Sequence, residues 1–182
     1  MSELDPRVQA LIDKDEIRDC IYRFARAVDR HDWELARACY HEAAIDDHGV
    51  FTGDKDEYVD WVSENLPKLA EMTMHFVGNV IIELDGDVAH SESYLVGYHR
   101  YSRQDGTPAD FVGGARYVDR FERRGGAWKI AHRVLVWEWV RDEPVGWEWE
   151  GFGIDPATFT FGEHGFGDPA YTHGRDARSE AS

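Results

Sequence analysis

The chain has 182 residues, of which 42% are hydrophobic and 13% aromatic, enough apolar material for the core of one domain. Its 36 acidic and 20 basic residues give a formal net charge of -16, which argues against nucleic acid or an anionic membrane as a partner, because both need positive patches. Two cysteines are too few for a disulfide framework, and no secretory leader or membrane-spanning apolar run is present in the sequence, which predicts a cytoplasmic protein.

The N-terminal part of the chain has helical spacing. A short helix is expected over residues 4–12, and a longer one begins at Ile17, because apolar residues recur there at intervals of three and four up to Val28. Asp29 follows directly, at the edge of the apolar stripe. Taken alone, it would be interpreted as a solvent-exposed carboxylate on the last helical turn.

A second helix and a short strand are expected next. Asp32 can cap a helix that ends near His41. Residues 44–51, AIDDHGVF, have the composition of a strand that carries polar residues where a core strand would have none. Because side chains alternate along a strand, Asp46 and His48 share one face.

The spacing then changes from helical to strand-like. A third helix is expected over residues 56–69, followed by four long strands whose short, Gly-containing links are typical of hairpins; the strands are expected over residues 72–84, 88–102, 110–123 and 127–140. Glycines inside the strands indicate bulges or kinks that bend the sheet. Helices followed by such a meander predict an α+β fold, a cone-shaped barrel in which a strongly curved mixed or antiparallel sheet is closed by the N-terminal helices.

The last strand and the residues after it predict contacts beyond the barrel. The last strand is apolar on both faces, with Trp137 and Trp139 expected on the same one, so its outer face should be covered, most simply by another subunit. Beyond it the chain is rich in Gly, Pro and aromatic residues and loses all periodicity. We therefore expect a barrel domain over residues 1–145 and an irregular tail over residues 146–182 that packs on the barrel or on a neighbouring subunit.

Polar side chains on the predicted concave face of the sheet could carry chemistry. His75 interrupts an apolar strand, and a neutral histidine beside a carboxylate such as Asp29 is a general base held in one tautomer, so we expect the two within hydrogen-bond reach. The face would line an apolar cavity with a few polar points, the usual composition of a small-molecule site: Asp29, His48, His75, His99, Tyr117 and Arg133. Each also has a simpler interpretation as a satisfied core residue, a solvent-facing strand residue or, for Arg133, a structural ion pair.

A metal site is the sharpest alternative for this group of residues. Suitable donors are present, but no HxH, HxxxH or HExxH spacing brings two of them onto one element: Asp46, Asp47, His48, His75 and His99. Glycine loops that cradle phosphate and Ser or Cys nucleophile motifs are also missing from the sequence. We therefore expect neither a metal ion nor a cofactor.

Several stretches together resemble a known family. VDRHDW followed by EAAID, then MTMHFVGN, and the hairpin RYVDRFERRGGAWKIAHR are similar to the SnoaL-like branch of the nuclear-transport-factor-2-like superfamily, over residues 8–140. The enzymes of that branch that the chain resembles are γ-hexachlorocyclohexane dehydrochlorinase, scytalone dehydratase and bile acid 7α-dehydratase. The resemblance implies a cone-shaped α+β barrel, usually trimeric, in which an Asp-His pair performs elimination without a cofactor.

Matched by motif, the resemblance also implies roles for individual residues. Asp29 and His75 correspond to the catalytic pair, and Arg133 to an arginine that assists the leaving group. His48 falls where scytalone dehydratase has a tyrosine that polarises its substrate, and Tyr117 falls on a pocket-lining strand position.

Two departures separate the chain from these enzymes. Phe24 stands where the dehydrochlorinase has a lysine and the bile acid enzyme a tyrosine, and Val28 stands where scytalone dehydratase has a tyrosine, so none of their three substrates follows. The sequence instead predicts a largely apolar, aromatic or polycyclic small molecule, contacted by the side chains expected around the site: Phe24, His48, Trp61, His99, Tyr117, Leu135 and Trp137.

These inferences combine into one hypothesis with two alternatives. The hypothesis is a cofactor-independent lyase of aromatic compound catabolism, a dehydratase or related elimination enzyme, in which His75 takes a proton from carbon while Asp29 stabilises the imidazolium. The protein could instead be a non-catalytic scaffold that needs a large catalytic partner, like the small subunit of a ring-hydroxylating dioxygenase, or a cyclase or isomerase that uses the same pair. We expect a homo-oligomer, with a trimer favoured, and the leaving group is left open.

Overall fold

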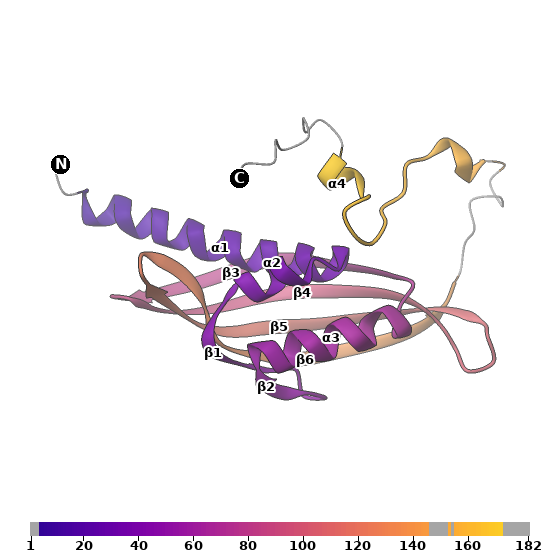
Figure 1. Ribbon diagram of the computed structural model, residues 1–182, viewed down its shortest axis with the longest axis horizontal. Coiled ribbons are helices and arrows are strands. Elements are labelled where there is room, and N and C mark those ends of the chain that lie inside the picture. The colour runs from indigo at the N-terminus through magenta and orange to yellow at the C-terminus, as the bar shows by residue number, and fades with distance from the viewer. Residues whose placement is uncertain (1–3, 146–152, 154, 173–182) are drawn as a thin grey trace.

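Helices cover one face of a single six-stranded sheet in the computed structural model, which describes residues 4–145, 153 and 155–172. Helices α1 (Pro6–Arg30), α2 (Trp33–Ala38) and α3 (Lys55–Leu69) precede the long strands in the chain and lie together on the sheet (Figure 1). None of the helices in the described ranges has both the length and the apolar composition that crossing a bilayer requires. The expected α+β fold is confirmed.

The sheet is mixed, and its strand order is β2-β1-β6-β5-β4-β3. β1 and β6 are parallel, whereas the other neighbouring pairs are antiparallel. The four long strands therefore form the expected meander, and the short N-terminal strands extend it at the β6 edge. The strands are β1 (Tyr40–Asp47), β2 (Thr52–Asp54), β3 (Met72–Asp85), β4 (Val88–Ser102), β5 (Pro108–Arg124) and β6 (Ala127–Pro144).

Helix α1 is one continuous helix, and the expectation of two successive helices was wrong. Its polar middle turn is held by Asp13, which is only 6% exposed and accepts hydrogen bonds from Trp128 Nε1 at 3.0 Å and Arg123 Nη1 at 2.9 Å. Because this carboxylate is satisfied by the sheet, the helix continues to Arg30 and ends at His31, which adopts a left-handed conformation with φ of 55°.

The next two helices begin as their capping residues predict. The Asp32 carboxylate accepts a hydrogen bond from Leu35 N–H at 3.1 Å, and α2 ends earlier than expected because Tyr40 already belongs to β1. Helix α3 begins with a capping box in which Asp54 and Glu57 satisfy each other's backbone N–H groups. These caps fix the two helices that flank the short strand β1.

A register shift between β5 and β6 separates two tryptophans that the sequence pattern placed on one face. The shift falls at Gly114 and Ala115, so Trp137 and Trp139 lie on opposite faces of the sheet. A Cβ atom on Gly113 would lie 2.5 Å from Trp137, and one on Gly114 would collide with Trp139. The glycine pair thus makes room for one indole on the concave face and for the other on the outer face.

A second register shift, between Val77 and Val80, affects strand β3. His75 faces the concave side, as predicted, but Asn79 is exposed and lies beside Phe76 in a groove on the outer face. Uninterrupted strand alternation would place Asn79 on the face of His75, but the extra residues of the bulge reverse the alternation beyond Val77.

The described part of the tail lies beside the C-terminal end of α1 (Figure 1). Gly165 N–H donates to the Arg30 carbonyl at 2.6 Å, Arg30 forms an ion pair with Asp168 at 3.4 Å, and the rings of His31 and His164 stack with centroids 3.7 Å apart. Residues 146–152, 154 and 173–182 lie outside the described residues. The division of the chain at residue 145 and the packing of the whole tail therefore stay predictions.

Candidate active site

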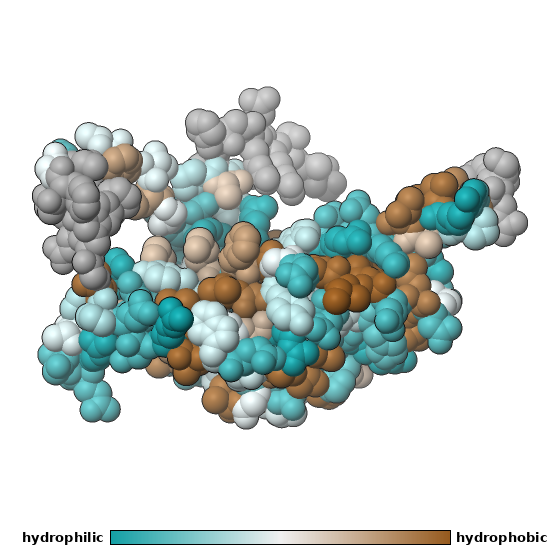
Figure 2. Space-filling view, turned by 180° about the vertical axis from the view of Figure 1, so that it is seen from behind, coloured by the Kyte–Doolittle hydropathy of each residue, from teal (hydrophilic) through white to brown (hydrophobic). Residues whose placement is uncertain are grey.

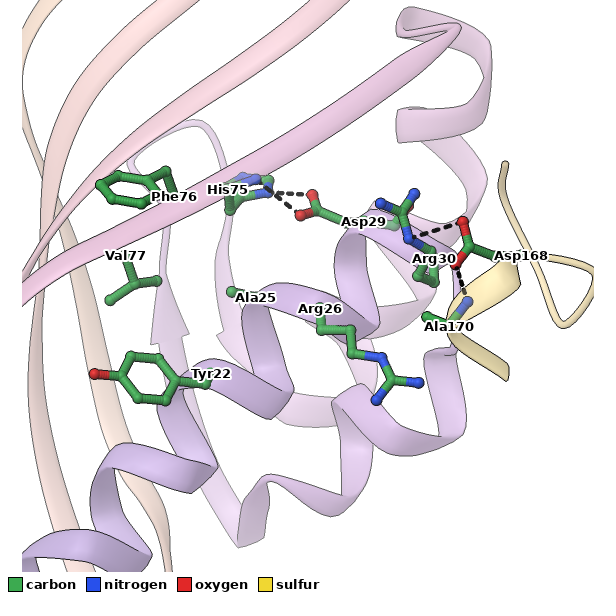
Figure 3. Close-up of a pocket in the computed structure, with 10 residues that line it drawn as sticks. All are labelled: Tyr22, Ala25, Arg26, Asp29, Arg30, His75, Phe76, Val77, Asp168 and Ala170. Atoms are coloured by element: carbon green, nitrogen blue, oxygen red, sulfur yellow. Dashed lines mark hydrogen bonds and ion pairs between the residues drawn. The ribbon is translucent and has the colours of Figure 1, made fainter. Parts of the chain in front are cut away.

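Asp29 and His75 are in direct contact, although they are far apart in the sequence. Asp29 lies on the last turn of α1, and His75 lies on β3, the edge strand of the sheet. His75 Nδ1 lies 2.7 Å from Asp29 Oδ1, and His75 backbone N–H donates to Asp29 Oδ2 at 2.8 Å (Figure 3). The two side chains are 12% and 8% exposed. The carboxylate therefore keeps the proton on Nδ1 and leaves Nε2 free to act as a base.

The electrostatics of the pair favour an ionised Asp29. Burial by itself would raise the pKa of Asp29, but the hydrogen bonds and charge of His75 outweigh it, and the pKa lies below its ordinary value. His99 faces His75 edge-on, with ring centroids 5.4 Å apart. Burial, followed by the charge of His75, lowers the pKa of His99 to about 4, so His99 is neutral at neutral pH.

A cavity of about 510 Å³ lies between the helices and the concave face of the sheet, and His75 opens into it. All the side chains that were expected to contact a substrate line this cavity: Phe24, His48, Trp61, His99, Tyr117, Leu135 and Trp137. Asp29 stands behind His75 and lines a separate pocket of about 360 Å³ instead (Figure 3). The histidine is thus the member of the pair that a bound molecule would touch.

Arg133 is not at the cavity surface, contrary to expectation. It is fully buried and forms a bidentate ion pair with Asp119 at 2.8 and 2.7 Å, between directly paired residues of β5 and β6. Its guanidinium carbon lies 4.4 Å from the ring centroid of Phe24 and 3.8 Å from that of Tyr117. Because these rings line the cavity, they separate Arg133 from it, and the structural ion pair is the interpretation that the geometry favours.

A second histidine of the cavity wall also has a carboxylate behind it. His48 Nδ1 forms a short hydrogen bond with Asp46, and His48 Nε2 lies 3.1 Å from the Tyr58 hydroxyl. Asp46 is fully buried and also accepts a hydrogen bond from the Tyr40 hydroxyl at 2.5 Å. Strand alternation predicted that Asp46 and His48 share one face, whereas Tyr58 was not among the predicted site residues. The contact of the Tyr58 hydroxyl with His48 could not be predicted from the sequence, because tyrosine is common on buried helix faces.

Other cavity residues were missed for similar reasons. Phe111, Tyr101 and Gly97 line the wall beside His99, and no local pattern separates them from ordinary strand residues. Within the described part of the chain, no three His, Cys, Asp or Glu side chains are grouped as metal ligands would be. The polar groups of the cavity are instead two carboxylate-backed histidines, one neutral histidine and several tyrosines.

Solved structures with the same fold include proteins named as lyases and proteins of unknown function. A protein provisionally named a scytalone dehydratase from Novosphingobium aromaticivorans superposes with a TM-score of 0.65 at 20% identity, covering 76% of this chain and 97% of that one. Hexachlorocyclohexane dehydrochlorinase LinA-type3 from Novosphingobium barchaimii gives 0.68 at 16% identity, covering 78% and 97%. A protein of unknown function with a cystatin-like fold from Nostoc punctiforme gives 0.59 at 25% identity, covering 75% and 96%.

The sequence comparisons show the family. No curated protein matches the chain. A family model of the SnoaL-like domain matches residues 9–134, which is more than half of the chain and includes both Asp29 and His75. The chain therefore belongs to the SnoaL-like domain family, whose nuclear-transport-factor-2-like fold includes dehydratases and dehydrochlorinases.

Proposed function

We propose that the protein is a cofactor-independent lyase that removes a proton from carbon of a hydrophobic aromatic or polycyclic small molecule and expels a leaving group. The observation that carries this proposal is the 2.7 Å contact between Asp29 and His75 Nδ1, with the His75 ring at the wall of an apolar cavity. A buried carboxylate behind a histidine base is an arrangement suited to proton abstraction.

The chemistry follows from the two nitrogens of His75. Nε2 accepts the proton from carbon, while Asp29 accepts the Nδ1 hydrogen bond throughout and stabilises the imidazolium that forms. As the leaving group departs with its bonding electrons, a double bond forms between its carbon and the deprotonated carbon. The imidazolium then returns its proton to solvent, so the cycle needs no redox cofactor.

The cavity supports an aromatic or polycyclic substrate. Its volume of about 510 Å³ lies within the range of sites for small organic molecules, roughly 300–1,000 Å³. Trp61, Phe111 and Trp137 supply flat apolar surfaces on which rings can pack. The polar groups are few and lie on the wall, where they would orient a substrate with one or two oxygen atoms.

The two alternatives predict different outcomes. A scaffold without activity has no use for a carboxylate-backed histidine that opens into a cavity, and the direct contact of Asp29 with His75 argues against it. A cyclase or isomerase would use the same base, but no fragment would leave. The mass of the product therefore separates a lyase from an isomerase.

A screen with purified protein tests the proposal. Hydroxylated and halogenated aromatic and steroid-like compounds are incubated with the wild type, His75→Ala and Asp29→Asn, and products are followed by mass spectrometry. His90→Gln is the matched control, because His90 is exposed on β4 outside the cavity. We expect loss of a fragment with wild type and control and a decrease of about 100- to 10,000-fold in the dyad variants. Equal activity in all four proteins would refute the mechanism.

A further inference from the structure

The cavity contains two histidines that are each backed by an aspartate, and only one is needed as the base. His48 is 14% exposed at the wall, while its partner Asp46 is fully buried. The Tyr40 hydroxyl donates to the second oxygen of Asp46 at 2.5 Å, so both carboxylate oxygens are occupied. The Asp46 carboxylate therefore orients Nδ1–H of His48 and leaves Nε2 for the Tyr58 hydroxyl at 3.1 Å.

The position of His48 is set by the turn between β1 and β2. His48 N–H donates to the Phe51 carbonyl at 2.8 Å, and Asp47 accepts hydrogen bonds from Gly49 N–H and Thr52 Oγ1, both at 2.9 Å. Gly49 has a φ of 78°, a conformation that favours glycine. The ring of His48 also stacks on Tyr58 with centroids 4.5 Å apart. The imidazole is thus held before any ligand binds, as a proton-transfer group requires.

Asp46 belongs to a buried polar cluster on this side of the cavity. Asp46 and Asp119 are both fully buried, and Asp119 forms the ion pair with Arg133. The Asp46 carboxylate instead contacts the His48 ring and the Tyr40 hydroxyl. A carboxylate in this position can stabilise the imidazolium form of a histidine that carries a proton to a substrate.

The other ionisable groups around His48 are tyrosines that stay protonated and an aspartate that lies outside the cavity. Burial raises the pKa of Tyr58 and of Tyr117, so both tyrosines stay protonated and Tyr58 keeps a hydroxyl hydrogen that it can donate. Asp47 points away from the cavity into the turn, where Gly49 and Thr52 satisfy it. Tyr58 therefore lies at the cavity wall beside His48, with one hydrogen to pass on.

We propose, resting on the lyase function above, that His48 and Tyr58 protonate the leaving oxygen, and that the substrate is a hydroxylated aromatic or polycyclic compound that loses water. His75 Nε2 takes the proton from carbon, the carbon–oxygen bond breaks, and the oxygen leaves with that electron pair. It receives the Tyr58 hydroxyl proton as Tyr58 receives the proton of His48 Nε2. The products are an alkene, water, protonated His75 and neutral His48, and solvent restores both histidines.

A proton donor speeds the departure of some leaving groups and not of others. Hydroxide is a strong base and leaves poorly unless it is protonated, whereas chloride leaves as a stable anion and gains nothing from a proton. A carboxylate-backed donor opposite the base would thus be idle in dehydrohalogenation. In this assignment His48 and Tyr58 are catalytic residues, and Asp46 and Tyr40 are positioning residues.

Two substrates with the same skeleton test the assignment. 3-Hydroxy-1-tetralone and 3-chloro-1-tetralone both yield 1-naphthol after elimination, and both have a C–H made acidic by the ketone. In Tyr58→Phe and His48→Gln, kcat for the hydroxy compound should decrease at least about 100-fold while KM changes little, and kcat for the chloro compound should decrease less than about threefold.

The His75→Gln variant separates failure of this inference from failure of the proposed function. It should slow both substrates, because the base acts on both. Equal losses with the two compounds in Tyr58→Phe, or no loss with either, would overturn the donor assignment and leave the lyase standing. Conversion of neither compound by the wild type would contradict the lyase for this substrate class, and the next measurement then decides on the donor by itself.

That measurement needs no substrate. Long-range proton–nitrogen NMR spectra follow protonation of the His48 ring during a pH titration of the whole protein. Asp46→Asn should weaken proton binding by His48 at least about tenfold, because a carboxylate in contact stabilises the imidazolium, and Asp47→Asn should change it little. Unchanged proton binding in Asp46→Asn, with the fold verified by circular dichroism, would overturn the inference.

Discussion

Asp29 holds His75 at two points, accepting one hydrogen bond from its backbone N–H at 2.8 Å and one from its ring at 2.7 Å. One carboxylate therefore joins the end of α1 to the edge strand β3 and also sets the tautomer of the base. In the proposed mechanism, catalysis and the packing of helix on sheet depend on the same side chain.

Replacing Asp29 by asparagine should therefore have two effects. Without the carboxylate the imidazolium loses its stabilising charge, and kcat should decrease about 100- to 10,000-fold. The unfolding free energy should decrease by about 1–3 kcal/mol, because two charge-assisted hydrogen bonds are weakened. Steady-state kinetics and urea denaturation on the same preparation measure both. A variant that loses stability but keeps its turnover would show that the contact is only structural.

Acid should destabilise the fold through His99. Burial and the charge of His75 lower its pKa to about 4 from 6.5, so between these values the unfolded chain binds a proton that the folded chain does not. The unfolding free energy should therefore fall as the pH drops through this window, by about 3 kcal/mol in full. Urea midpoints at about pH 7 and about pH 5 should differ less in His99→Phe than in the wild type. Equal differences would contradict the assignment.

Removing Arg133 alone should be severe for stability. Arg133→Met leaves Asp119 buried and unpaired, which should cost about 3–5 kcal/mol, and the double variant with Asp119→Leu should recover most of that loss. Because Phe24 and Tyr117 separate the guanidinium from the cavity, the double variant should keep kcat within about tenfold of the wild type. A folded double variant without activity would instead support the leaving-group role that the family resemblance implies.

The neighbouring glycines of β5 allow a matched test of the cavity wall. In Gly113→Ala the new methyl group would lie 2.5 Å from Trp137 and push the indole into the cavity, whereas in Gly114→Ala it would displace Trp139 on the outer face. KM should increase roughly three- to tenfold in the first variant, equivalent to about 1 kcal/mol of binding, and change little in the second. Similar KM values in both would mean that Trp137 does not contact the substrate.

We predict that the protein is a homo-oligomer, with a trimer favoured, and that the outer face of the sheet is buried in it. Figure 2 shows hydrophobic side chains gathered on the molecule seen from behind. Large apolar residues exposed on this face include Met74, Phe76, Tyr94, Val96 and Trp139. Sedimentation at micromolar concentration should show an oligomer that Phe76→Glu dissociates and Leu11→Glu, on exposed α1 surface, does not. A monomeric wild type would contradict the prediction.

Much of the fold could be predicted because it depends on local patterns. The change from helical to alternating spacing after residue 69 locates the sheet, and Asp32 caps its helix as its position predicts. Asp29 and His75 could also be identified, since each is a polar residue at the edge or in the middle of an apolar run. Their contact joins a helix end to a strand and required the family resemblance as well.

Features that depend on register could not be predicted. A single bulge moves every later side chain of a strand to the other face, which is why uninterrupted alternation places Asn79 and Trp139 on the wrong face. The pairing of Arg133 with Asp119 depends on the alignment of β5 with β6, which a single sequence does not specify. The contact of Tyr58 with His48 likewise depends on how α3 lies over β1.

Hydrogen exchange at carbon tests the central claim, proton abstraction by His75, without any leaving group. 1-Tetralone is incubated in D₂O with the wild type and with His75→Gln, and deuterium at its C2 position is followed by mass spectrometry. We predict exchange that is catalysed by the wild type and at least about 100-fold slower with the variant. Equal exchange with the two proteins, or none above the buffer rate with the wild type, would contradict it.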